Sequence, residues 1–206
     1  MSQRVGTYVA IGDSFTCGLE GDEVRWADEV AGALPGADYV NLAVVGATSE
    51  VVEEQQLPEA LEREPDLVSL VCGANDVLET VRPDPGLYAG RLSRMLERIR
   101  TEAPRAHVFT ITYPDLSRFV DLRPRTQARV ARGTRLYNAA LRSVSQRNGV
   151  LCVEAAEHPE AEERENFASD GFHASPEGHR RLGANIVRQL GERFPIETSP
   201  TKEATA

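Results

Sequence analysis

The stretch Ile11-Gly12-Asp13-Ser14-Phe15-Thr16-Cys17-Gly18 closes an apolar run that begins at Thr7. Such a run is typical of a buried strand, and flanking glycines permit a tight turn from a strand into a helix. A turn of this kind exposes one side chain, here that of Ser14. Taken alone, a serine after Gly-Asp is most often a turn or cap residue, so Ser14 has to be weighed with the rest of the chain.

Five short apolar runs alternate with longer segments of helical periodicity. The runs cover residues 7–11, 39–42, 67–72, 107–111 and 150–153. This alternation is typical of a parallel sheet with crossover helices. We therefore expect an α/β fold, a three-layer α/β/α sandwich with a five-stranded parallel sheet and a flavodoxin-like arrangement.

The C-terminal part of the chain carries clear helix signals. Ser175 and Pro176 match a helix cap and a first-turn proline, and apolar residues follow at four-residue steps from Leu182 to Phe194. Residues 197–206 are small, polar and without caps. We expect a single domain over residues 1–195 and a disordered tail over residues 196–206.

Composition limits the classes of partner. The chain has 206 residues, a formal net charge of −9 and a pI near 5.0, which argue against nucleic acid and anionic membranes as partners. No signal-peptide pattern precedes the first apolar run, so we expect a cytoplasmic protein. His and Cys pairs with ligand spacing and nucleotide-binding glycine motifs are missing from the sequence, so we expect no metal and no cofactor.

The segment Asp170-Gly171-Phe172-His173 offers a base that could activate Ser14. Of the four histidines, only His173 has an aspartate three residues earlier. That spacing lets one turn carry both groups, so that Asp170 accepts the Nδ1 proton while Nε2 faces Ser14. The alternative for Asp170 is a helix-start residue.

Two further segments offer polar donors at the ends of apolar runs. Residues 41–49 contain Gly46, and residues 73–76 contain Asn75. A glycine in a tight loop lets a ligand approach the backbone, and a neutral amide donates a hydrogen bond without requiring a counter-charge. These donors could bind an oxyanion, although each alone is also ordinary turn chemistry.

In their order and spacing, these four segments resemble the SGNH/GDSL hydrolase family over nearly the whole chain. The resemblance implies that Ser14, Gly46, Asn75 and His173 match the family's invariant residues. It implies an esterase that forms an acyl-enzyme on Ser14, with the oxyanion bound by the backbone N–H groups of Ser14 and Gly46 and by the amide of Asn75. Two positions depart from the family pattern: Phe15 stands where many members carry Leu, and Ala174 stands where many carry Pro. Neither change removes a reacting group.

The substrate implied by the resemblance is a small-molecule acyl ester. Ligands of open α/β sheets bind at the carboxyl ends of the strands, so we expect the loops 113–125 and 155–169 to form the walls of its pocket. Tyr113, Arg118 and Phe119 are candidate pocket residues, with a solvated surface loop as the alternative. An acyltransferase or thioesterase that uses the same three residues, and a binding module that has lost catalysis, remain alternative functions. The sequence does not indicate an oligomeric state.

Overall fold

The computed structural model describes residues 3–19 and 24–199. It contains one five-stranded sheet in the order β2-β1-β3-β4-β5, with every neighbouring pair parallel. The strands are β1 (Thr7–Gly12), β2 (Asp38–Asn41), β3 (Leu67–Val71), β4 (His107–Ile111) and β5 (Leu151–Val153). The predicted parallel sheet and its flavodoxin-like order are confirmed.

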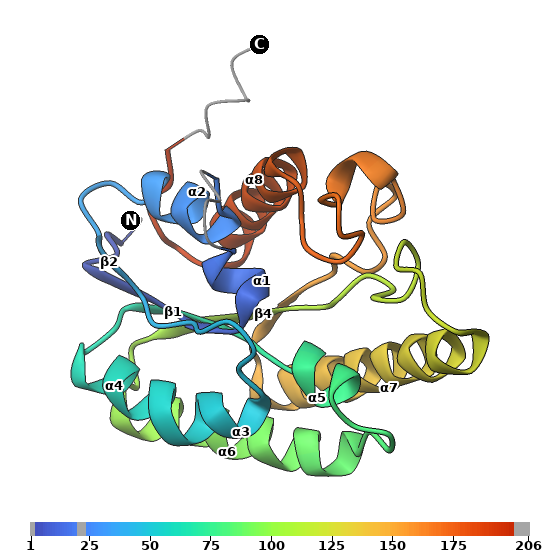
Figure 1. Cartoon of the computed structure of the whole chain (residues 1–206). Helices are drawn as coiled ribbons and strands as arrows, with labels where there is room; N and C mark the ends of the chain where they lie inside the picture. The colour runs from blue at the N-terminus through green and yellow to red at the C-terminus, as the bar shows by residue number, and fades with distance from the viewer. Residues whose placement is uncertain (1–2, 20–23, 200–206) are drawn as a thin grey trace.

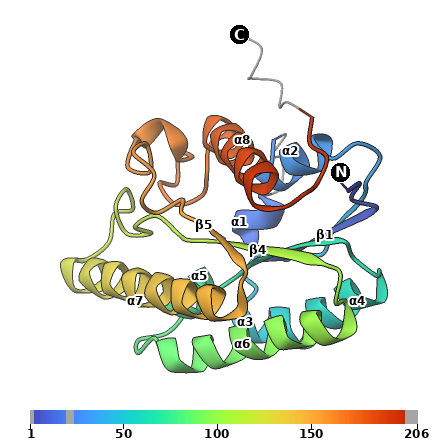
Figure 2. The ribbon, with the colours of Figure 1, turned by 180° about the vertical axis from the view of Figure 1, so that it is seen from behind.

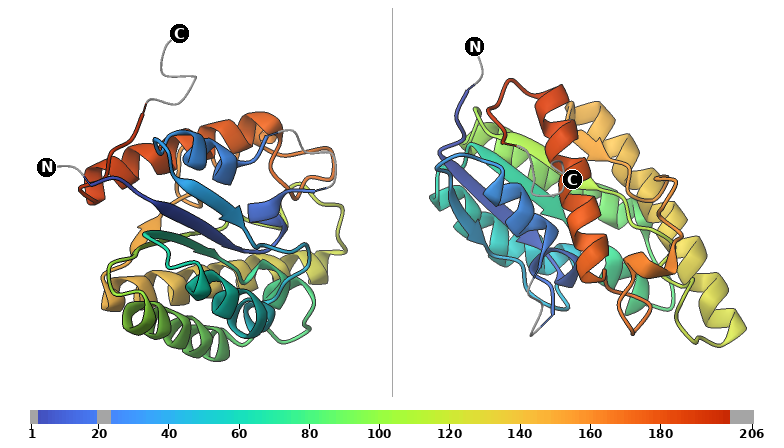
Figure 3. Two further views of the ribbon diagram at one scale, coloured as in Figure 1. Left: turned by 90° about the vertical axis from the view of Figure 1, so that its left-hand side faces the viewer. Right: turned by 90° about the horizontal axis from the view of Figure 1, so that it is seen from above.

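Helices cover both faces of the sheet and complete the three layers (Figure 1). One face carries α1 (Ser14–Cys17), α2 (Trp26–Gly32) and α8 (Pro176–Arg193). The opposite face carries α3 (Ser49–Val51), a π-helical turn (Val52–Gln56), α4 (Leu57–Glu62), α5 (Ala74–Leu78), α6 (Pro85–Glu102) and α7 (Pro124–Asn148). Figures 2 and 3 show the sheet enclosed between these two layers.

The core lies against both faces of the central strands. All five residues of β3 and all but the first of β1 are buried. A parallel strand that is covered on both faces carries a continuous apolar run, and the sequence pattern shows such runs here. On the α2 and α8 face, the ring of Trp26 packs edge-on against Phe109 of β4 at 6.1 Å between centroids.

The start of α8 follows the sequence signals, whereas the end of the chain does not. The Ser175 hydroxyl caps the helix by accepting a hydrogen bond from the N–H of Gly178, and Pro176 is the first helical residue. The prediction of a disordered tail is wrong for residues 196–199. Ile196 is buried in the hydrophobic core and forms a bridge with Gln3, and the N–H groups of Glu197 and Ser199 donate to the carbonyls of Gln3 and Ala33, because burial of an apolar side chain anchors the segment. Residues 200–206 lie outside the described residues.

The carboxyl ends of all the strands meet at one edge of the sheet. Ser14 follows β1, Gly46 follows β2, Asn75 follows β3, and the Asp170–His173 turn lies beyond β5. The strand order reverses between β1 and β3, which is the place where open α/β sheets bind ligands. Within the described part of the chain, none of the helices has the length and apolar composition needed to cross a bilayer.

Candidate active site

The structure brings Ser14, His173 and Asp170 into one hydrogen-bonded chain. The Oγ atom of Ser14 lies 2.9 Å from Nε2 of His173, and Nδ1 of the same ring lies 2.7 Å from Oδ2 of Asp170. Ser14 is the first residue of α1 and is buried, while His173 comes from the loop that leads into α8. Residues 159 positions apart are thus placed at contact distance by the sheet.

The second oxygen of Asp170 organises the turn that carries His173. Its Oδ1 accepts hydrogen bonds from the backbone N–H groups of Phe172, at 2.8 Å, and of His173, at 3.0 Å. Partial burial tends to raise the pKa of Asp170, but the hydrogen bonds from the His173 ring and these two N–H groups outweigh it and lower the pKa. Asp170 therefore stays ionised. It holds His173 both by the hydrogen bond to the ring and by the hydrogen bonds to the backbone of the turn.

Gly171 allows the loop after β4 to pack against the turn that carries His173. Gly171 has a φ of 72°, and a Cβ atom there would lie 2.2 Å from the carbonyl oxygen of Phe119. Only glycine accepts both this dihedral angle and this close backbone approach. The loop 113–125 thus contributes to the site through its backbone.

The turn that carries Ser14 is held by two polar side chains. Asp13 is fully buried, and its carboxyl accepts hydrogen bonds from the N–H of Phe15 at 3.0 Å and the hydroxyl of Tyr113 at 3.3 Å. The buried amide of Gln56 bonds both backbone groups of Gly12, accepting from its N–H at 2.7 Å and donating to its carbonyl at 2.9 Å. Together these contacts fix the backbone on both sides of the serine.

The loops after β2 and β3 are joined to each other beside the serine. The amide of Asn75 donates to the carbonyl of Ala47 at 3.0 Å, next to Gly46, which is exposed and has a φ of 81°. Asp76 accepts hydrogen bonds from the N–H of Ser49 at 2.8 Å and from its hydroxyl at 2.5 Å. The two candidate oxyanion donors, Gly46 and Asn75, therefore belong to one rigid unit.

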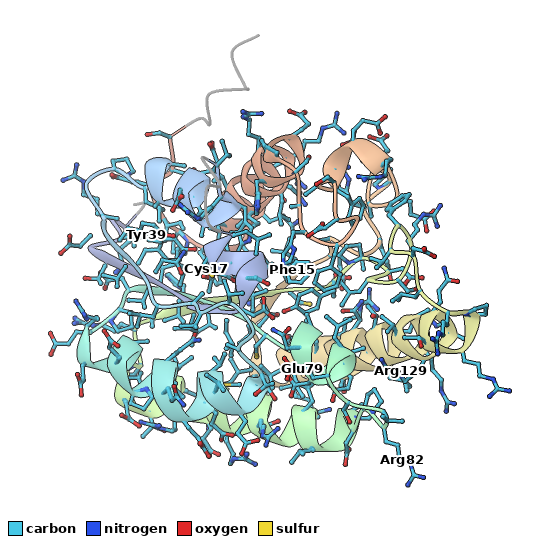
Figure 4. The ribbon with its side chains drawn as sticks, in the orientation of Figure 1. Phe15, Cys17, Tyr39, Glu79, Arg82 and Arg129 are labelled. Carbon is cyan, nitrogen blue, oxygen red and sulfur yellow. The ribbon has the colours of Figure 1, made fainter. Side chains whose placement is uncertain are left out.

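Two cavities border the site, one beside His173 and one beside Asn75. The first has a volume of about 120 Å³ and an apolar wall that includes Phe15 and Phe172. Phe15 extends from α1 toward the loops on this side of the molecule (Figure 4). The second cavity, of about 250 Å³, is lined by Asn75 and by charged side chains that include Arg91. The reacting groups are thus flanked by two chemically different spaces.

The three predicted pocket residues do not line either of these cavities. Tyr113 is buried and points to Asp13, with its ring edge-on to Phe15. Arg118 pairs with a carboxylate of the neighbouring loop, Glu162, at 3.0 Å. The Phe119 ring packs against Phe167 at 4.9 Å. From the loop 113–125, the first cavity takes Pro114 instead, while the loop 155–169 supplies several of its lining residues.

Comparison with known proteins gives a match to a family over most of the chain. A model of the GDSL-like lipase/acylhydrolase family matches residues 10–181, a span that begins in β1 and ends after the His173 turn. The chain belongs to this family. The predicted resemblance is therefore confirmed, and the match includes each of the four motif segments. A search of curated proteins finds no match.

Solved structures with the same fold include two lipases and an acetylxylan esterase. A lipase/acylhydrolase from Enterococcus faecalis is 26% identical, with a TM-score of 0.71 over 96% of this chain and 99% of that one. A catalytic mutant of an acetylxylan esterase from Geobacillus stearothermophilus is 20% identical, with a TM-score of 0.73 over 93% and 97%. An extracellular lipase from Streptomyces rimosus is 18% identical, with a TM-score of 0.68 over 92% and 100%.

In this GDSL-like family member, the structure also shows a support residue that the sequence did not single out. Arg129 of α7 donates from its guanidinium to the carbonyls of Val77 at 2.7 Å, Thr80 at 2.5 Å and Leu78 at 3.4 Å (Figure 4). Val77 and Leu78 end α5, the helix that carries Asn75, and Thr80 lies two residues beyond it, so the guanidinium binds carbonyls that a helix end leaves without an internal partner. Among the many arginines of α7, no sequence signal distinguishes Arg129. Gln56 was likewise missed, because a glutamine in a helical segment carries no motif.

Asp13 gives this family member a testable dependence of stability on pH. Burial raises the pKa of Asp13 to about 7, against the opposing effect of its hydrogen bonds from Phe15 and Tyr113. An aspartate in the unfolded chain titrates near 3.9. Between about pH 4 and pH 7 the folded protein therefore holds a proton that the unfolded chain releases, so the contribution of Asp13 to stability falls as pH rises and levels off above about pH 7.

Replacing Asp13 by Asn should remove this decrease in stability with rising pH. The amide can accept from the N–H of Phe15 and donate to the oxygen of Tyr113, so both contacts survive. Between about pH 5 and pH 8 we expect the wild-type protein to lose roughly 1–4 kcal/mol more unfolding free energy than Asp13→Asn, measured by urea denaturation. Asp121→Asn, at an exposed position, is the control. Parallel pH profiles for wild type and Asp13→Asn would contradict the prediction.

Proposed function

We propose that this protein hydrolyses carboxylic esters through an acyl-enzyme formed on Ser14. The observation that carries the proposal is the hydrogen-bonded chain from Ser14 Oγ to His173 Nε2 and from His173 Nδ1 to Asp170, at 2.9 and 2.7 Å. This is the arrangement in which a weak hydroxyl nucleophile gains a general base and the base gains a fixed orientation. The ester-cleaving enzymes among the similar structures, a lipase and an acetylxylan esterase, support an ester as substrate.

In the first step, Ser14 Oγ attacks the ester carbonyl carbon. Asp170 keeps the proton on Nδ1 of His173, so Nε2 has a free lone pair and accepts the serine proton as the new carbon–oxygen bond forms. The imidazolium that results is stabilised by the carboxylate of Asp170, which stays ionised because its pKa is lowered. The product of this step is a tetrahedral intermediate with a negative oxygen.

That oxygen is bound by donors from three strand ends. They are the backbone N–H groups of Ser14 and Gly46 and the side-chain amide of Asn75. An amide nitrogen carries two hydrogens, so the bond from Asn75 to Ala47 leaves one for the oxyanion. Because Asp76 and Ser49 fix these loops to each other, little reorganisation is required when the charge develops.

The intermediate then collapses and the ester carbon–oxygen bond breaks. His173 returns its proton from Nε2 to the departing alkoxide, which leaves as an alcohol and leaves an acyl group on Ser14. Water then repeats these steps on the acyl-enzyme. Nε2 of His173 takes a proton from the water as its oxygen attacks the acyl carbon. When the second intermediate collapses, His173 returns the proton to Ser14 Oγ and the carboxylic acid is released.

A fluorophosphonate probe tests this assignment directly, because it reacts covalently with an activated serine. We expect stoichiometric labelling of the wild-type protein at Ser14 and no labelling of folded Ser14→Ala. Absence of labelling on a folded wild-type protein would contradict an active nucleophile and favour a binding module. Product analysis in the presence of an added alcohol or thiol acceptor separates hydrolysis from acyl transfer.

Arg129 is predicted to act on catalysis through the position of Asn75. Arg129→Met keeps the aliphatic stem but removes the three hydrogen bonds to the end of α5. We expect kcat for a small acetate ester to fall by roughly tenfold with a smaller change in KM, since small displacements of a catalytic donor are costly. Arg129→Lys should recover part of the loss.

The matched control for this variant is Arg132→Met, at an exposed position of the same helix. It should leave both kinetic constants unchanged. If Arg129→Met lowered the melting temperature but left kcat and KM as in wild type, Arg129 would be a purely structural residue.

A further inference from the structure

The cavity beside His173 is not lined by the reacting residues themselves, but two of its lining residues contact the His173 ring. Its apolar lining includes Phe15, Pro114, Ala155, Ala161, Phe167 and Phe172, and its volume is about 120 Å³. We call it the His-side cavity. Most of its lining residues come from α8 and from the loop that follows β5. Both α1 and α8 lie on one face of the sheet (Figure 1).

Two of its aromatic walls contact the proposed base. The Phe15 ring lies 5.5 Å from the imidazole of His173, and the Phe172 ring lies 5.0 Å from it, centroid to centroid. Phe15 directly follows Ser14 in the chain, and Phe172 directly precedes His173. The His-side cavity thus shares two aromatic walls with the surroundings of the His173 imidazole. Asn75, in contrast, lines the other cavity.

The proposed reaction fixes which half of an ester faces this cavity. The carbonyl oxygen must point to Gly46 and Asn75 for its charge to be stabilised. The ester oxygen that leaves must point to Nε2 of His173, because it receives the proton from that atom. The group attached to the leaving oxygen is therefore directed to the His173 side of Ser14.

The mouth of the cavity carries an excess of negative charge. Arg181, which lines it, is contacted by the carboxylates of Glu163 at 2.8 Å, Glu177 at 2.9 Å and Glu160 at 3.3 Å. Glu177 also pairs with Arg180 at 3.5 Å, so two guanidinium groups stand against three carboxylates. Asn166 is also engaged, since its amide donates to the carbonyl of Glu160 at 2.7 Å. An anionic ligand would meet repulsion here, whereas an uncharged group would not.

We propose that the His-side cavity binds the alcohol part of the substrate, as an uncharged aromatic or compact alkyl group about the size of a benzene ring. This inference rests on the proposed function, which supplies the direction of the leaving group. An apolar cavity of roughly 150 Å³ accommodates benzene, so a space of about 120 Å³ is comparable in size to a benzene ring. The protein then prefers esters of benzyl-type alcohols to esters of small or anionic alcohols.

The kinetic test compares benzyl acetate with ethyl acetate, which share the acyl group and differ only in the alcohol. For the wild-type protein, we expect kcat/KM to be about tenfold or more higher for benzyl acetate, from burial of the ring. Ala161→Phe fills the cavity and should bring this ratio close to one. A general loss of activity would affect both esters equally and would leave this ratio unchanged. Ala155→Leu is a second variant that fills the same cavity. An unchanged ratio in both folded variants overturns the proposal.

The matched control is Glu162→Phe, which adds the same ring at the neighbouring position outside the cavity lining. It should keep the wild-type ratio. A charge test uses 4-carboxybenzyl acetate, which should react several-fold more slowly than benzyl acetate at low salt, with a smaller difference at high salt. Equal rates at low salt would contradict the role of the acidic mouth.

A binding measurement separates failure of this proposal from failure of the proposed function. Benzyl alcohol should show saturation-transfer NMR signals with the wild-type protein and with Glu162→Phe, and weaker signals with Ala161→Phe. If the fluorophosphonate probe does not label Ser14 and no ester is cleaved, the proposed function fails while this binding pattern still supports a site for apolar alcohols. If Ser14 is labelled but benzyl alcohol does not bind, the cavity proposal alone is overturned.

Discussion

Ser14→Ala and His173→Ala are each expected to lower kcat for ester hydrolysis by roughly three orders of magnitude or more, while the fold is retained. The first removes the atom that forms the acyl bond, and the second removes the lone pair, 2.9 Å away, that accepts its proton. The two side chains act as a unit in a single step. The double variant should therefore be hardly slower than either single variant.

The measurement is steady-state hydrolysis of a small acetate ester, with circular dichroism melting to verify folding. Ser143→Ala, at an exposed serine of α7 that lines neither cavity, serves as the matched control and should keep wild-type activity. A Ser14→Ala protein that retained more than about a tenth of wild-type activity would exclude Ser14 as the nucleophile, because loss of a nucleophile leaves far less.

Asn75→Ala is expected to lower kcat by roughly a hundredfold, with a smaller change in KM. The amide donates to charge that exists chiefly in the transition state, so its loss affects turnover more than substrate binding. The variant also loses the hydrogen bond to Ala47, but Asp76 still joins the two loops through Ser49. The folded arrangement of the site should therefore survive.

The matched control is Asn148→Ala, which removes an amide that donates to the carbonyl of Val144 near the end of α7. Its kinetic constants should equal those of the wild-type protein. If Asn75→Ala kept its kcat but showed a raised KM, Asn75 would be a contact to the ground-state substrate and the oxyanion assignment would be wrong.

The sequence by itself determined the fold class and the identity of the residues that meet at the site. Buried parallel strands produce continuous apolar runs, and the runs alternate with helical segments, so the sheet was predictable from local pattern. The resemblance carried by the four motif segments, in their order and spacing, then predicted that Ser14, Gly46, Asn75 and His173 belong to one site. The start of α8 at Pro176 was equally local, since a cap depends on adjacent residues.

Only the tertiary structure decided how these residues are held and what surrounds them. Gln56 and Arg129 support the site through contacts with residues 44 or more positions away, and nothing in their local sequence distinguishes them from solvated side chains. The inward direction of Tyr113, the pairing of Arg118 with Glu162 and the docking of Ile196 also depend on which segments the fold places side by side. The His-side cavity is likewise a space between α8 and two loops, and its shape is a property of their packing. Local pattern specifies which elements form, whereas long-range packing specifies which side chains face one another.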